Sequence, residues 1–168
     1  MIRLLFFFCL FLFASSASFG QAKVGSKTPS ISIDEWLKGD AVTEFKSGTV
    51  YLVEFWGTWC HPCVDNIPHL SELQKKYGSQ GLVVIGVATH ETKDRAFLMD
   101  WMKTNGDAME YTVAYDSDQS MEKDWDTGGS GDFRLPVCFL IDSSGKVVFA
   151  GHPANKKLES LIEATVSK

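Results

Sequence analysis

The fold class that the sequence predicts is α/β, with a central mixed and mostly parallel sheet and helices on both of its faces. Strand-length apolar runs alternate with segments of helical periodicity, which is typical of parallel strands joined by crossover helices. The runs are largely apolar on consecutive residues, which indicates strands covered on both sides. A length of 168 residues without an internal repeat favours one domain.

The first half of the chain predicts an arm, two strands and one long helix. Residues 22–48 are mixed and polar, and indicate a short hairpin or an extended arm. An apolar, β-rich run predicts a strand over 49–55, and a similar run predicts one over 81–88. Apolar side chains recur at helical spacing over 61–78, where Gly78 is a natural stop, and Pro68 is expected to kink this helix.

The second half continues the alternation and ends with two consecutive strands. We expect helices over 92–106, 117–126 and 155–166, and strands over 109–116, 136–142 and 146–151. The strand over 109–116 is expected to be short and close to an edge of the sheet. The tight turn 143–145 predicts a hairpin, which makes one edge antiparallel, and the glycine-rich segment 128–133 is interpreted as a flexible link.

The charge pattern gives no sign of a nucleic-acid surface. The formal net charge is −5, and the two lysine pairs, 75–76 and 156–157, are isolated and best interpreted as solvated helix faces. We therefore expect no nucleic-acid partner.

The N-terminal residues have the pattern of a secretory signal peptide. Arg3 precedes an apolar run over residues 4–14, which small residues follow, and this run is shorter than the ~20 residues that span a bilayer. We expect cleavage after Gly20, or after Ala17, which gives a signal peptide over 1–20, a single domain over 21–168 and a secreted or periplasmic location. Cys9 would be discarded with the signal peptide.

The remaining cysteines are Cys60 and Cys63, which are separated by two residues, and Cys138. A zinc site needs about four ligands, and one Cys pair with an awkwardly placed His61 does not supply them, so we expect no metal. As a structural staple, a disulfide that closes so short a loop adds little stability. A reversible redox pair fits best, because the start of a helix favours a thiolate at Cys60, while Cys63, one turn further in, stays protonated until needed. Pro62 suits the first helical turn, where its missing N–H has no partner to lose.

The stretch "VEFWGTWCHPC", followed later by "LPVCFLIDSSGKVV", resembles the thioredoxin superfamily. The closer resemblance is to the exported TlpA/ResA-like thiol–disulfide oxidoreductases, and it extends from about Val24 to the C-terminus. It implies a thioredoxin-like fold and exchange of the Cys60–Cys63 dithiol/disulfide with cysteines of exported client proteins. No cofactor is implied beyond this redox-active disulfide, and the expected state is a monomer.

The resemblance also implies roles for individual residues. Cys60 would be the exposed nucleophile and Cys63 the resolving thiol. Glu54 would be a buried acid with a raised pKa that takes the proton from Cys63. Pro136 would follow a cis peptide bond beside Cys60, and the backbone of Leu135 would pair with an extended substrate.

The immediate neighbours of the cysteine pair would border and tune the site. Trp59 matches the bordering aromatic residue of the resemblance. A cation at His61, next to Pro62, would favour the Cys60 thiolate and make the couple more oxidising. The alternative interpretations are a solvated turn residue for His61 and a lysine-paired acid for Glu54. Cys138 is expected to be a buried small hydrophobe, with a third redox thiol as the alternative.

The direction of electron flow stays open at this point. The resemblance favours a reductant that receives electrons from a membrane thiol carrier. One alternative is a disulfide-forming oxidase or isomerase, and another is a non-enzymatic binding module with the same fold. A peroxiredoxin is disfavoured because the chain has no Pro-x-x-x-Thr-x-x-Cys pattern.

Overall fold

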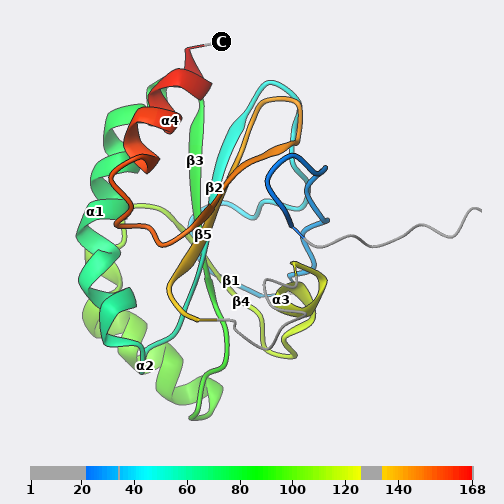
Figure 1. The fold of residues 1–168 in the computed structure, drawn as a ribbon. Helices are drawn as coiled ribbons and strands as arrows, with labels where there is room; N and C mark the ends of the chain where they lie inside the picture. Colours follow the sequence, from blue (N-terminus) through cyan, green and yellow to red (C-terminus); the bar gives the residue numbers. More distant parts are fainter. Residues whose placement is uncertain (1–21, 34, 126–133, 168) are drawn as a thin grey trace, which may run out of the picture.

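The structure is a computed structural model that describes residues 22–33, 35–125 and 134–167 (Figure 1). Within these residues, six strands form one mixed sheet in the order β1-β4-β3-β2-β5-β6. The strands are β1 (Glu35–Lys38), β2 (Val50–Trp56), β3 (Leu82–Ala88), β4 (Thr112–Tyr115), β5 (Val137–Ile141) and β6 (Val147–Gly151).

Helices cover both faces of the sheet, as the sequence predicts. They are α1 (His61–Tyr77), α2 (Arg95–Asn105), α3 (Ser120–Trp125) and α4 (Leu158–Val166). In Figure 1, α1, α2 and α4 lie on one side of the sheet and α3 on the other. The side chains agree, because one core contains Leu70 of α1, Leu98 of α2 and Ile162 of α4, whereas Trp125 of α3 belongs to a second core.

Strand β2 separates the two cores by simple alternation. Leu52 and Trp56 contribute to the core under α1, whereas Val53 and Phe55 contribute to the core under α3. All seven residues of β2 are buried, and it pairs with β3 on one side and β5 on the other. Glu54 therefore faces the α1 side from the middle of a fully covered strand.

The sheet is less parallel than the sequence predicts. Strands β2 and β4 run parallel to β3, but β5 pairs antiparallel with β2, β6 with β5 and β1 with β4. The sequence predicts only one antiparallel edge. In the structure, β5 begins beside the C-terminal end of β2, with Val137 opposite Phe55. Because β4 ends and β5 begins at the same end of the sheet, β5 has to run antiparallel to β2.

Helix α1 ends where the sequence predicts, although Gly78 is not the residue that adopts the left-handed conformation. Gly78 has helical dihedral angles and begins a short 3₁₀ turn, and the left-handed residue is Gly81, with φ of 97°. Pro68 lies inside the helix, which runs continuously from His61 to Tyr77. The α2 helix begins at an Asp94 cap, whose carboxylate accepts a hydrogen bond of 3.0 Å from the N–H of Phe97.

The N-terminal residues form an extended arm across the second core. Lys27 bridges Lys146, and further on β1 pairs with β4. Strand β4 is short, as expected, and lies second from the edge because β1 covers it. The predicted signal peptide and the 128–133 link lie outside the described residues.

Candidate active site

The two cysteines lie at the junction of β2 and α1. A turn over residues 57–60 connects the strand to the helix, and Cys60 is the N-cap of α1. Cys60 and Cys63 form a disulfide with Cα atoms 5.3 Å apart. The first turn of α1 contains no acidic residue, so the positive end of the helix dipole acts on the Cys60 sulfur without an opposing charge from that turn.

The accessibility of the pair differs from the expectation of an exposed nucleophile. Cys60 is 5% exposed and Cys63 is 1% exposed, whereas the neighbouring Trp59 is 44% exposed. His61 and Pro62 are also exposed. The expected order holds, since Cys60 is the more open of the two, but in this disulfide form Cys60 is nearly covered because it packs into the core under α1.

Hydrogen bonds from the loop after β3 hold the turn before Cys60. The indole N–H of Trp59 donates to the carbonyl oxygen of His90 at 2.7 Å. Thr58 donates to the Glu91 carboxylate twice, from its backbone N–H at 2.8 Å and from its hydroxyl at 2.6 Å. A Cβ at Gly57 would lie 2.8 Å from Nε1 of Trp59, so this position accepts only glycine without displacement of the indole.

The same network reaches α3. Nε2 of His90 lies 2.7 Å from Oε1 of Glu122, and the Thr89 hydroxyl donates to the other oxygen of that carboxylate at 2.7 Å. The sequence alone does not predict a role for His90, Glu91 or Glu122. The partners are about 30 residues apart in the chain, and no local pattern signals that they meet.

Pro136 follows a cis peptide bond, as the resemblance predicts. The peptide bond between Leu135 and Pro136 is cis. Pro136 is buried and Leu135 is half-buried. Since Val137 pairs with Phe55, the antiparallel register places Pro136 level with the end of β2, at the same edge of the sheet as the cysteine pair.

Glu54 lies beneath the site on the α1 side of the sheet. It is 1% exposed, and burial raises the pKa of its carboxyl well above the ordinary value. Its neighbours in register are Gly86 on β3 and Cys138 on β5. Among the described residues no lysine or arginine forms an ion pair with Glu54, so the interpretation of a lysine-paired acid is wrong.

Cys138 is a buried free cysteine in the same core as Cys60 and Cys63. Period-two alternation from Pro136 predicts this face, and the burial confirms the expectation of a small hydrophobe. Burial and the nearby Glu54 charge both raise the pKa of its thiol. A raised pKa keeps the thiol protonated and unreactive in this position.

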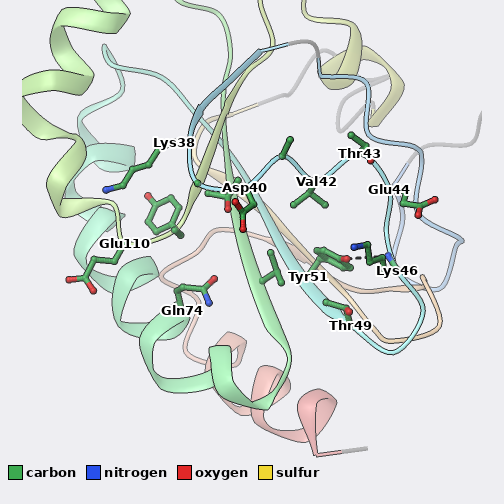
Figure 2. Close-up of a pocket in the computed structure, with 15 residues that line it drawn as sticks. Lys38, Asp40, Val42, Thr43, Glu44, Lys46, Thr49, Tyr51, Gln74 and Glu110 are labelled. Carbon is green, nitrogen blue, oxygen red and sulfur yellow. Dashed lines mark hydrogen bonds between the residues drawn. The ribbon is translucent and has the colours of Figure 1, made fainter.

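A groove on the described surface is separate from the cysteine pair. It measures about 680 Å³ and is bordered by the loop that follows β1, the start of β2 and the residues leading into β4 (Figure 2). Figure 2 shows Tyr51 close to Lys46, and the Lys46 N–H donates to the Tyr51 hydroxyl at 3.1 Å. None of the predicted site residues lines this groove, but Tyr111 does.

Within the part of the chain that the structure describes, no cluster of three or more His, Cys, Asp or Glu side chains has the arrangement of a metal site. The same residues include no helix that is both long and apolar enough to cross a membrane.

A disulfide at a helix start, at the same edge of the sheet as a cis-proline and on the sheet face that holds a buried acid, is typical of a site for thiol–disulfide exchange. The comparisons with known proteins agree with this class. Residues 23–165 match the Redoxin family, so the chain belongs to that family. It is a thiol–disulfide oxidoreductase of the ResA type with a thioredoxin-like fold.

Individual relatives support the same assignment. Thiol-disulfide oxidoreductase ResA of Bacillus thuringiensis is 31% identical over 147 residues, which cover 85% of this chain and 79% of that protein. Protein FixW of Rhizobium leguminosarum is 29% identical over 136 residues, 76% of this chain and 60% of that protein, so the match spans less than two thirds of its length. A thiol:disulfide interchange protein from Chlorobium tepidum has the same fold, with a TM-score of 0.68 at 24% identity over 86% of this chain and 98% of that one.

Proposed function

We propose that this protein is an exported reductant of disulfides in client proteins. The observation that carries the proposal is the Cys60–Cys63 disulfide at the N-terminus of α1, in which Cys60 is the more exposed of the two residues. In the reduced protein the Cys60 thiolate attacks a client disulfide, and one client sulfur leaves as a thiolate. Cys63 then attacks Cys60, the Cys60–Cys63 bond forms, and the second client thiolate leaves.

The surrounding residues take the roles that the resemblance implies. Glu54 accepts the proton of Cys63 before the second attack, which suits a carboxyl whose pKa burial raises. The backbone of Leu135, next to the cis-proline, pairs with an extended client segment. Trp59 borders the approach to Cys60, and its 44% exposed fraction offers an apolar contact to the client.

An insulin-reduction assay tests the activity. Wild-type protein with dithiothreitol is expected to accelerate insulin precipitation, and Cys60→Ser is expected to abolish the acceleration. The matched control is Cys138→Ala, which removes the thiol outside the pair and should keep the activity. No acceleration by the wild type, or equal rates in wild type and Cys60→Ser, would support a non-enzymatic binding module instead.

A disulfide-forming oxidase is the second candidate function. The position of His61 next to Cys60 favours it. His61 is exposed at the first position of α1, directly after Cys60. A cation there stabilises the thiolate of the reduced form, which makes the couple more oxidising. Equilibration with glutathione separates the two, because reductants such as thioredoxin have potentials of about −270 mV and the oxidant DsbA about −120 mV.

The location and partners belong to the same proposal. Residues 1–20 act as a signal peptide, 21–168 form the exported domain, and a membrane thiol carrier returns the electrons. N-terminal sequencing of protein from the periplasm or medium should find a new terminus at residue 21, or at residue 18. A single species of monomer mass in light scattering would support the monomeric state.

A further inference from the structure

Three buried side-chain polar atoms of the described residues have no hydrogen-bond partner. They are Oε1 of Glu54, Nε1 of Trp56 and the hydroxyl oxygen of Tyr111. Burial without a partner is uncommon in folded proteins, because the group gives up its water contacts and gains nothing in return. The three atoms comprise one hydrogen-bond acceptor, on Glu54, and two donors, on Trp56 and Tyr111.

All three residues are neighbours of Gly86. Glu54 and Gly86 are direct neighbours on the parallel strands β2 and β3. A Cβ at Gly86 would lie 2.9 Å from Cε2 of Tyr111 and 3.3 Å from Nε1 of Trp56. The missing side chain of Gly86 thus leaves room beside Glu54 in which the edge of the Tyr111 ring and the Trp56 indole nitrogen come together.

The chemistry of the three groups is complementary. An ionised Glu54 carboxylate only accepts hydrogen bonds, whereas the indole N–H of Trp56 only donates and the Tyr111 hydroxyl can donate. Glu54 and Tyr111 also interact electrostatically, since the Glu54 charge adds to burial in raising the pKa of Tyr111. A tyrosine that stays protonated remains a hydrogen-bond donor.

We propose that Tyr111 and Trp56 are positioning residues for Glu54. The Tyr111 hydroxyl and the Trp56 indole N–H donate hydrogen bonds to the Glu54 carboxylate when it is ionised. This inference rests on the proposed function, in which Glu54 accepts the proton of Cys63. In that step the Cys63 S–H bond breaks and the proton moves to Glu54. The Cys63 thiolate then bonds to Cys60, and the client leaves with the electron pair of the broken mixed disulfide.

The need for such donors follows from burial. An isolated carboxylate in an apolar site would stay protonated through the neutral range and could not act as a base. Two donors stabilise the ionised form and lower the pKa from that extreme. The titratable groups that face Glu54 are Tyr111, Cys138 on β5 and, in the reduced protein, Cys60 and Cys63 on α1, and none of these supplies a positive charge.

The conservative variant Tyr111→Phe tests the proposal. It keeps the ring, which also lines the groove of Figure 2, and removes only the hydroxyl. The titration of Glu54 in the reduced protein can be followed by carbon-13 NMR of labelled glutamate and assigned with Glu54→Gln. We expect its midpoint to rise by about one to two pH units in Tyr111→Phe, because the carboxylate loses a hydrogen bond.

A kinetic measurement on the same variant follows the second attack directly. Ellman's reagent forms a mixed disulfide with reduced Cys60, and the attack of Cys63 then releases a second thionitrobenzoate. At neutral pH we expect this second release to slow about tenfold or more in Tyr111→Phe, with the acid limb of its pH profile moved to higher pH.

Two further variants serve as control and as a second test. Tyr77 is a buried tyrosine of the same core whose hydroxyl lies 3.4 Å from Oε1 of Glu159, so Tyr77→Phe should leave the Glu54 midpoint unchanged. Gly86→Ala keeps Tyr111 but places a methyl group against its ring. It should raise the midpoint in the same direction.

An unchanged Glu54 midpoint in Tyr111→Phe would overturn the proposal even if the second release slowed, since slowing alone would indicate structural damage. Failure of the proposed function has a different signature. Wild-type protein would then show no second release, while the Glu54 titration would still be measurable, and a raised midpoint in Tyr111→Phe would still support the contact.

Discussion

The side chain of Trp59 and the backbone of His90 are joined by a hydrogen bond of 2.7 Å, although 31 residues separate them in the chain. The bond connects the turn before Cys60 to the loop after β3. His90 has a positive φ of 51°, which is uncommon for a residue other than glycine. The orientation of the exposed indole beside the disulfide therefore depends on a loop from a different part of the sequence.

Trp59→Phe should lower the free energy of unfolding of the oxidised protein by about 1 kcal/mol, because it removes this hydrogen bond and keeps an aromatic ring. Urea unfolding at neutral pH, with the disulfide intact, measures the change. Equal unfolding midpoints for Trp59→Phe and wild type would mean that the bond does not hold the turn.

Gly57→Ala should destabilise the oxidised protein by about 1–3 kcal/mol, because the added methyl group would lie 2.8 Å from Nε1 of Trp59 and 3.2 Å from the carbonyl oxygen of Thr89. Thermal or urea unfolding would measure the loss. Gly78→Ala is the matched control, since Gly78 already has helical dihedral angles and its methyl group would meet only the amide end of Gln74. A larger loss in the control than in Gly57→Ala would contradict this account.

Glu54 should make the oxidised protein less stable as the pH rises. Its folded-state pKa is raised above the ordinary value of 4.5, so the folded protein holds a proton that the unfolded chain releases. This contribution to stability is fully present below the unfolded pKa and is lost as the pH rises towards the folded pKa, by about 1.4 kcal/mol per pH unit.

The measurement compares Glu54→Gln with wild type by urea unfolding at several values between pH 5 and pH 8. The difference in unfolding free energy between the two should change with that slope, because other titrating groups, such as Asp116, are common to both proteins. A constant difference across this range would show that Glu54 is not held protonated.

Cys138→Ala should cost about 1 kcal/mol of stability, since it removes one buried sulfur atom from the core under α1. Because the thiol is buried and its pKa is raised, the equilibrium of the Cys60–Cys63 couple with glutathione should stay the same. A changed redox equilibrium would instead support the alternative of a third redox thiol.

Much of the fold is visible in local sequence patterns. Apolar runs predict β2 and β3, and the spacing of Ile67, Leu70 and Leu73 predicts α1, because both depend on which side chains a single element buries. The Cys60–Cys63 pair lies at the predicted strand–helix junction. The proportion of antiparallel pairing was less predictable, since the direction of β5 depends on where the preceding chain enters the sheet.

The sequence by itself determined the order of strands and helices, the placement of two cysteines at a helix start and the proline that precedes β5, since each follows from neighbouring residues. Only the tertiary structure decided that Cys60 is nearly covered, that His90 holds Trp59 and that Glu54, Trp56 and Tyr111 are all neighbours of Gly86. These relationships join residues from different strands and loops, and the register of the sheet brings them within contact distance.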